Sequence, residues 1–210
     1  MPTVSRRLLL AAAATTVIPG RLAFANELTM TPEQTEGPFY PRILPVDSDN
    51  DLVQVRGSPA RAMGTVLHLQ GRVLDAAGNR LTGAVVEIWQ CDSQGLYDHP
   101  RQPGRERRDA AFQGYGRFVT DAKSHYGFRT LKPVAYPGRA PHIHLKVTIA
   151  DGKQLTSQFY LAGDPLNAGD FVYREATRDS RQRNRVEMHI VPAPGIEAGA
   201  FWSSMDIVVG

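Results

Sequence analysis

The chain has 210 residues, with 24 lysines and arginines, 21 aspartates and glutamates, and a single cysteine, Cys91. One cysteine excludes an intrachain disulfide, so stability must come from a hydrophobic core, a metal or assembly. Residues 1–25 contain three of the basic residues and no acidic one, which leaves 21 of each sign in the remainder. Because a nucleic-acid-binding domain carries its own basic footprint, this balance argues against a nucleic-acid partner.

The first 25 residues have the pattern of an export signal. Ser5-Arg6-Arg7 is a basic start, residues 8–18 are apolar but too few to span a membrane, and residues 23–25 are small enough to flank a cleavage point. The arginine pair before leucines predicts a twin-arginine signal peptide and a periplasmic location, with an ordinary secretory leader as the alternative. After cleavage we expect one domain of about 185 residues and no membrane span.

The chain from residue 26 to residue 64 is predicted to be an extended arm. Its segment 31–40 holds prolines and a glycine at a density that argues against a helix or a central strand. The arm is followed by a region in which residue types change to β-branched and aromatic ones.

Residues 65–210 are predicted to form the folded domain, because short strand-like segments alternate with turn signals such as Asp151-Gly152. The expected strands are residues 66–74, 84–90, 116–120, 126–131, 142–149, 155–161, 185–191 and 205–209. Residues 166–183 are polar and expected to be partly helical. Because no long amphipathic helix is present, the pattern predicts an all-β antiparallel β-sandwich with long loops.

Residues 142–149 alternate between polar and apolar side chains, which is typical of a half-buried strand. Side chains two positions apart leave the same face of a strand, so His142 and His144 lie side by side. Two adjacent imidazoles can hold one metal ion, although a bare pair also occurs on solvated sheet faces. A Pro-Gly turn before the strand could fold Tyr136 and Arg139 back over the pair.

Five short motifs around this strand carry a family resemblance. They are Trp89-Gln-Cys-Asp-Ser-Gln-Gly-Leu-Tyr97, Tyr126-Gly-Phe-Arg-Thr130, Tyr136-Pro-Gly-Arg139, Pro141-His-Ile-His144 and Ser157-Gln-Phe-Tyr160. In this order they resemble the intradiol ring-cleavage dioxygenases, and among those they are most similar to the protocatechuate 3,4-dioxygenase type. The resemblance runs from about residue 31 to residue 164 and is weaker beyond.

The resemblance implies a non-haem Fe(III) site. Its ligands would be two phenolates and two imidazoles, from Tyr97, Tyr136, His142 and His144. A phenol has a pKa of about 10, and a bound trivalent cation stabilises its phenolate form. The resemblance further implies catalytic roles for Arg139, Tyr136 and Gln158. It also implies substrate contacts from Gly37, Pro38, Tyr40 and Arg139.

The implied reaction is cleavage of a catechol-type ring by O2 to a muconate-type diacid, and a homo- or hetero-oligomer is possible. The link between Tyr136 and His142 is short, and Gly138 stands where the protocatechuate type often has a bulky aromatic, so we expect a more open pocket. Two alternatives remain at this point. One is a zinc hydrolase that uses His142, His144 and a carboxylate, and the other is a non-catalytic transthyretin-like binding sandwich.

Overall fold

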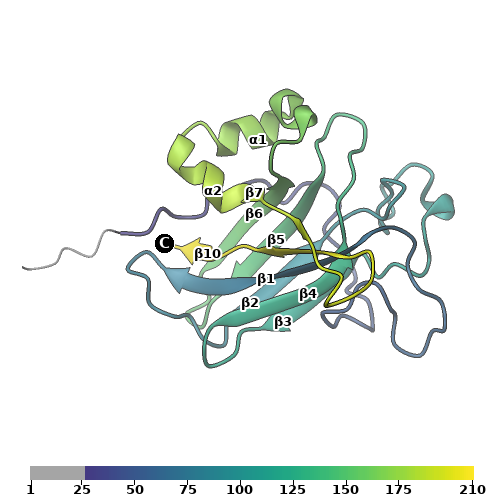
Figure 1. The fold of residues 1–210 in the computed structure, drawn as a ribbon, viewed down its shortest axis with the longest axis horizontal. Coiled ribbons are helices and arrows are strands. Elements are labelled where there is room, and N and C mark those ends of the chain that lie inside the picture. The colour runs from purple at the N-terminus through teal and green to yellow at the C-terminus, as the bar shows by residue number, and fades with distance from the viewer. Residues whose placement is uncertain (1–26) are drawn as a thin grey trace, which may run out of the picture.

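The computed structural model describes residues 27–210, and the predicted signal peptide of residues 1–25 lies outside them. The described chain folds into two five-stranded sheets packed face to face, with two short helices at one side (Figure 1). The predicted sandwich is therefore confirmed. No helix within residues 27–210 has the length and apolar character needed to cross a membrane.

The first sheet is built around β1 (Val66–Asp75). On one side β1 pairs antiparallel with β4 (His125–Leu131), and on the other it runs parallel to β9 (Phe201–Ser204) and then to β10 (Ile207–Val209). The short strand β8 (Val191–Pro192) pairs with β9 at the edge.

The second sheet carries the histidine pair. Its order is β3 (Tyr115–Val119), β2 (Val85–Trp89), β5 (His142–Thr148), β6 (Gln154–Leu161) and β7 (Glu187–Met188). The pairings between β3, β2, β5 and β6 are antiparallel, whereas β7 runs parallel to β6. The central strand β5 thus lies between β2 and β6, which bring their own polar residues beside the two histidines.

The C-terminal third departs from the sequence expectation in its details. Both sheets are mixed rather than purely antiparallel, because three late strands run parallel to β1 or β6. A crossover must connect two parallel strands, and the helical segment between β6 and β7 provides it for that pair. The expected strand over residues 185–191 divides into the end of α2 (Arg183–Val186), β7 and β8, and β9 was not expected at all.

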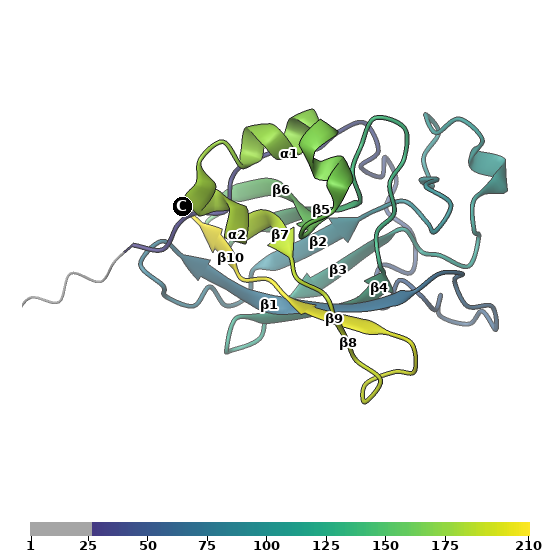
Figure 2. The same ribbon diagram turned by 45° about the horizontal axis from the view of Figure 1, so that its top comes forward.

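The helical segment packs beside the β6–β7 edge of the second sheet (Figure 2). It contains η2 (Pro165–Gly169), α1 (Phe171–Ala176), η3 (Ser180–Gln182) and α2, which agrees with the partly helical expectation. Three of these short helices begin at an aspartate whose carboxylate accepts backbone N–H groups, a common N-cap arrangement. These N-caps are Asp164, Asp170 and Asp179.

The core between the sheets explains the alternation seen in β5. Ile143, Leu145 and Val147 are fully buried between the sheets. A half-buried strand exposes its other face to solvent, yet His142 and His144 on that face are each only 1% exposed. The chain itself covers this outer face, which makes the histidines a buried pair rather than a surface pair.

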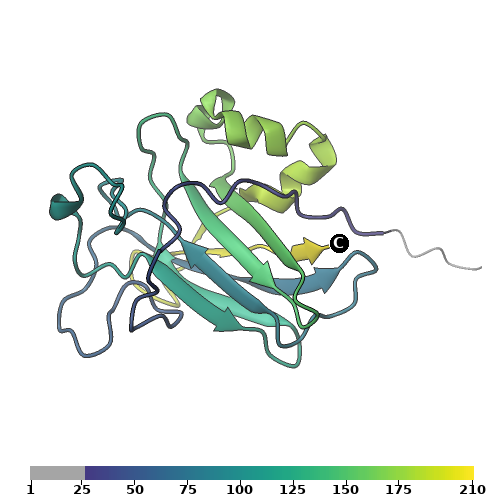
Figure 3. The ribbon, with the colours of Figure 1, turned by 180° about the vertical axis from the view of Figure 1, so that it is seen from behind.

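The N-terminal arm provides part of that cover (Figure 3). The backbone N–H of Thr31 donates to the carbonyl of Val208, and that of Gln34 donates to the carbonyl of Thr156 in β6. Before Val66 the described residues form no helix or strand, apart from an isolated bridge at Asp51. The arm is extended over the second sheet, and its cross-links to β6 and β10 position its later residues above β5.

Candidate metal centre

The histidine pair lies at the start of β5, where the strand leaves the Pro-Gly turn. The two Nε2 atoms of His142 and His144 are 3.2 Å apart. The Nδ1 atom of His142 lies 2.7 Å from the carbonyl oxygen of Ala140, to which its N–H donates, so Nε2 carries the free lone pair. Burial is the main cause that lowers the pKa of His142 to about 4, followed by the charge of Arg139. Burial also lowers the pKa of His144, so both rings are neutral and able to act as ligands.

Two neighbours hold the ring of His144 in place. Trp89 in β2 stacks on it at a centroid distance of 4.8 Å and an interplanar angle of 8°. On the arm, Gly37 has a φ of +72°, and a Cβ there would lie 3.3 Å from Cε1 of His144. Glycine is favoured at that position both for its backbone conformation and for its close approach. The predicted arm residue Gly37 is thus in contact distance of the histidine pair.

Tyr97 reaches the pair from the long loop that follows β2. The buried carboxylate of Asp92 organises this loop by accepting the backbone N–H groups of Gln94 and Leu96. The ring of Tyr97 is 2% exposed and stacks on Phe39 of the arm at 4.5 Å. Its hydroxyl is buried and has no hydrogen-bond partner among residues 27–210. An orphaned buried hydroxyl requires an explanation, and a bound ion is one.

Tyr136 closes the group from the turn before β5. Its ring centroid lies 5.7 Å from that of Tyr97 and 5.5 Å from that of His142. The ring of Tyr97 is in turn 6.2 Å from that of His144. The structure therefore brings together all four side chains that the family resemblance implied as ligands. Burial raises the pKa of both phenols, so a nearby cation is needed to hold them as phenolates.

This donor set fits a hard trivalent cation better than zinc. Two neutral imidazoles and two phenols converge, and the hydroxyl of Tyr97 lacks any other partner. Within the described part of the chain, no three His, Cys, Asp or Glu side chains are placed to hold a metal together. The carboxylate that the zinc alternative requires is thus missing beside His142 and His144, whereas phenolate oxygen suits ferric iron.

Arg139 is fixed behind this group by three partners. Its Nε donates to Asp170 at 2.8 Å, and its Nη2 donates to Gln158 at 2.6 Å and to the hydroxyl of Tyr160 at 3.2 Å. The side chain of Asp170 is fully buried. Burial alone would raise its pKa, but the amides of Tyr173 and Ala140 and the charge of Arg139 outweigh burial and lower it. The guanidinium is therefore held in one orientation by a charged partner.

Gln158 connects Arg139 to the arm. Its Oε1 accepts from Arg139, while its Nε2 donates to the carbonyl of Thr35 at 2.9 Å. The arm makes two further hydrogen bonds to β6 through Gln34. Its Nε2 donates to the backbone carbonyl of Gln158 at 3.1 Å, and its Oε1 accepts from the hydroxyl of Tyr160 at 3.0 Å. Sequence reasoning did not identify Asp170, Gln34 or Phe39. Only Gln34 and Phe39 had a signal, since they lie in the proline- and glycine-containing segment 31–40 of the predicted arm.

The remaining two predicted substrate contacts are placed differently. Pro38 is exposed on the arm. Tyr40 lies one layer behind the histidines, edge-on to Trp89 at 5.0 Å, and its hydroxyl donates to Glu87 at 2.9 Å. Lys146 lies 3.7 Å above the ring of Tyr40. These contacts hold the half-buried Tyr40 beside Glu87 and Lys146, and its predicted contact with substrate stays a prediction.

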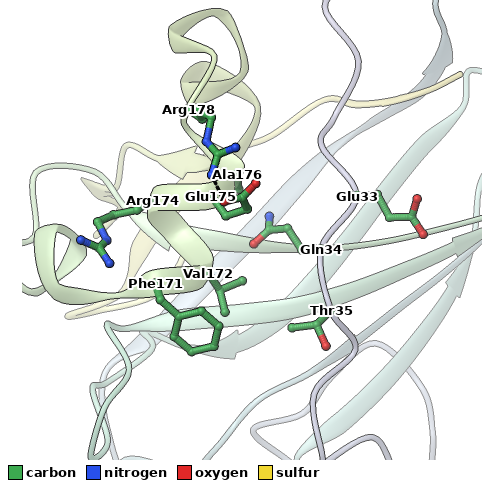
Figure 4. A pocket seen from close by; sticks show the side chains of 9 residues that line it. All are labelled: Glu33, Gln34, Thr35, Phe171, Val172, Arg174, Glu175, Ala176 and Arg178. Atoms are coloured by element: carbon green, nitrogen blue, oxygen red, sulfur yellow. Dashed lines mark hydrogen bonds and ion pairs between the residues drawn. The ribbon is translucent and has the colours of Figure 1, made fainter.

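Two hollows border the site, and a third lies further along the arm. One of about 210 Å³ is lined by Tyr136, Gly138 and Arg139, and a Cβ added at Gly138 would meet no atom within 4 Å. A second, of about 460 Å³, is lined in part by Tyr97 and Phe39. The third is a groove of about 750 Å³ between the arm and α1, which none of the four proposed ligands lines (Figure 4). The open space at Gly138 agrees with the expected loss of a bulky pocket wall.

Comparison with known proteins supports the family resemblance. The family model described as "Dioxygenase" matches residues 35–195. The chain is 37% identical over 143 residues to the protocatechuate 3,4-dioxygenase beta chain of Burkholderia cepacia, covering 62% of this chain and 60% of that one. It is 33% identical over 179 residues to a catechol 1,2-dioxygenase of Pseudomonas sp. (strain EST1001), covering 76% and 56%. The chain thus spans less than two thirds of the length of these curated relatives.

The fold agrees with these sequence matches. The dioxygenase domain of a dioxygenase–carbohydrate-binding protein fusion from Streptomyces sp. SirexAA-E superimposes with a TM-score of 0.66 at 28% identity. That match covers 86% of this chain and 98% of the other. Matches in sequence, fold and order of motifs therefore point the same way. The chain belongs to the intradiol ring-cleavage dioxygenase family.

Proposed function

We propose that this protein cleaves the ring of a catechol-type substrate with O2, in an Fe(III)-dependent intradiol reaction that gives a muconate-type diacid. The observation that carries the proposal is the convergence of two phenols and two imidazoles in one buried site. Tyr97, Tyr136, His142 and His144 would hold the metal. Family membership supports the same reaction class.

When bound, ferric iron supplies the Lewis acidity that stabilises the phenolates and a catecholate dianion and directs electron density onto the ring that O2 attacks. The chain supplies the charge balance, because the phenolates of Tyr97 and Tyr136 offset two of the three positive charges. The imidazoles of His142 and His144 are neutral and add none. Near-neutrality of the assembled site lowers the cost of burying it.

Proton transfer on substrate binding is assigned to Tyr136. It is the more accessible of the two phenols and lies on a turn beside the hollow at Gly138, whereas Tyr97 is packed under Phe39. Its phenolate oxygen can accept one catechol proton as the substrate enters, and hydroxide from solvent would take the second. Tyr97 then remains the permanent phenolate ligand, and the bulk of Phe39 and Trp89 keeps water from that side of the site.

Arg139 and Gln158 are proposed to stabilise and orient the substrate ring. The guanidinium is pinned by Asp170 through Nε and by Gln158 through Nη2, so it needs no reorganisation during the reaction. A fixed positive charge near the ring stabilises the negative charge that develops on it. The open hollow beside Gly138 supports a catechol with a larger substituent than the protocatechuate type accepts.

The proposal is tested by oxygen uptake. Iron-loaded protein is supplied with catechol, protocatechuate, hydroxyquinol and catechols with larger substituents, while the absorbance of the ring-opened product is recorded in parallel. We expect one O2 consumed per ring opened, with no external reductant, and a preference for a larger catechol. No oxygen consumption with any member of the panel would refute the proposed activity.

Export to the periplasm is proposed on the basis of residues 1–25 alone. Ser5-Arg6-Arg7 followed by an apolar run supports twin-arginine export. The test is cell fractionation of the full chain and of an Arg6→Lys, Arg7→Lys double variant. The wild-type chain should appear in the periplasm, and the double variant should stay in the cytoplasm. Periplasmic delivery of both would indicate an ordinary secretory leader.

A further inference from the structure

The cavity of about 460 Å³ shares one wall with the proposed metal centre and is otherwise separate from it. Tyr97 lines the cavity, but Tyr136, His142 and His144 do not. Its other aromatic walls are Phe39, Trp89 and Tyr115. The volume falls in the range of about 300–1,000 Å³ that is typical of small-molecule sites, and four aromatic walls favour a flat aromatic ligand.

The polar groups of this cavity are mainly basic. Arg42, His99 and Arg105 line it, and Asp98 is the acidic residue among its walls. The carboxylate of Asp98 is already engaged, because it pairs with both Arg105 and Arg108. Arg42 is exposed and makes no ion pair within residues 27–210. Its charge is therefore available to a ligand.

His99 offers a hydrogen-bond donor in the same cavity. It is 1% exposed, and its Nδ1 accepts the backbone N–H of Arg101 at 3.1 Å. A neutral imidazole that accepts at Nδ1 carries its proton on Nε2. That N–H has no protein acceptor in the described part of the chain. This N–H lies in the wall of the cavity, where it can donate to the carboxylate of a bound ligand.

We propose that this cavity is a second binding site, for a small aromatic carboxylate, beside the metal centre. The ring of the ligand would lie between Phe39, Trp89 and Tyr115, and its carboxylate would accept from Arg42 and from Nε2 of His99. Charge-assisted hydrogen bonds of this kind are about twice as strong as neutral ones. Since Tyr97 is the shared wall, a bound acid would contact a proposed metal ligand without binding the metal.

The binding test uses benzoate as the probe and isothermal titration calorimetry as the measurement. Benzamide, which lacks the charge, and acetate, which lacks the ring, serve as comparison ligands. Benzoate should bind more tightly than either. The variant Arg42→Gln should weaken benzoate roughly tenfold to a hundredfold and leave benzamide unchanged. The matched control is Arg181→Gln, at an exposed arginine that does not line the cavity, and it should bind benzoate like the wild type.

Two results would overturn the proposal. One is equal affinity for benzoate and benzamide, and the other is unchanged benzoate affinity in Arg42→Gln. The titration is repeated after a chelator has removed any metal, because the cavity contains only one of the four proposed ligands. Benzoate should still bind; loss of binding on chelation would place it on the metal instead and would also overturn the proposal. Absence of oxygen uptake with catechols would refute the proposed function and leave this binding result intact.

Discussion

Replacing Asp170 with asparagine tests whether this carboxylate both stabilises the fold and positions Arg139. Four donors converge on it. Its Oδ2 accepts from Nε of Arg139 and from the amide of Ala140, and its Oδ1 accepts from the amides of Val172 and Tyr173. An asparagine keeps one acceptor oxygen and turns an NH2 group toward the other two donors. Asp170→Asn therefore removes two hydrogen bonds and leaves a buried arginine without its counter-charge.

The expected loss of stability is large. Each hydrogen bond to a charged group contributes about 1.5–3 kcal/mol, and removing one partner of a buried ion pair costs about 3–5 kcal/mol. We expect the free energy of unfolding to fall by about 3–5 kcal/mol, out of the roughly 5–15 kcal/mol that a domain has. Urea unfolding measures this loss. Oxygen uptake at low temperature, where the variant is still folded, should also fall, since Arg139 is no longer fixed.

The matched control is Asp179→Asn. Asp179 also caps a short helix and pairs with an arginine, Arg181, but both side chains are exposed. Solvent screens such a pair, so its removal should change the unfolding midpoint far less than Asp170→Asn does. Equal and small changes in the two variants would refute the claim that burial makes Asp170 important. Normal oxygen uptake by folded Asp170→Asn would refute its positioning role.

Two further variants test the arm and a distant charge cluster. Gly37→Ala and Gly57→Ala both force alanine into a positive φ and should each cost about 1–2 kcal/mol, but only the first brings a Cβ to 3.3 Å from His144. Only Gly37→Ala should therefore lower iron occupancy, and equal occupancy in both would contradict the contact. The pKa of Glu197 is lowered from 4.5 to about 2, mainly by its hydrogen bond to Arg129. Because the folded pKa is depressed, Glu197 stabilises the fold above about pH 4.5, and this contribution disappears as the pH falls toward about 2. Glu197→Gln should cost about 1–2 kcal/mol at pH 7, a figure reduced for solvent screening, and its deficit in urea unfolding should shrink from pH 5 to pH 3. A deficit that is constant with pH would contradict this assignment.

Local patterns were sufficient to predict the four antiparallel strands of the second sheet, β3, β2, β5 and β6, but not β7. The alternation in β5 placed Ile143 and Leu145 in the core and both histidines on one face, as observed. The alternation could not reveal that this face is buried, because part of its cover comes from the arm, more than a hundred residues earlier in the chain. The strand β9 could not be predicted either, because it has only four residues and no alternation. Its parallel pairing with β1, and that of β10, depend on the assembled fold.

The order of motifs predicted which four rings meet, but the residues that support them needed the structure. Asp170 lies in a polar segment with no periodicity, and nothing in its sequence surroundings connects it to Arg139. Tyr40 illustrates the opposite case. It lies in the arm segment 31–40 and was a predicted substrate contact, yet its hydroxyl donates to Glu87, whose buried position follows from the strand pairing of β2 with β3 and β5. Tertiary contacts of this kind leave no local pattern in the sequence.

The most direct test of the central claim is the visible absorption spectrum of purified protein, read together with its metal content. One ferric ion per chain bound by the phenolates of Tyr97 and Tyr136 should give a red protein with a tyrosinate-to-iron charge-transfer band. Tyr136→Phe should lose or shift this band, whereas Tyr126→Phe should keep it, because Tyr126 is buried in the first sheet and donates to the carbonyl of Met205. A colourless protein with stoichiometric zinc and no iron would contradict the account.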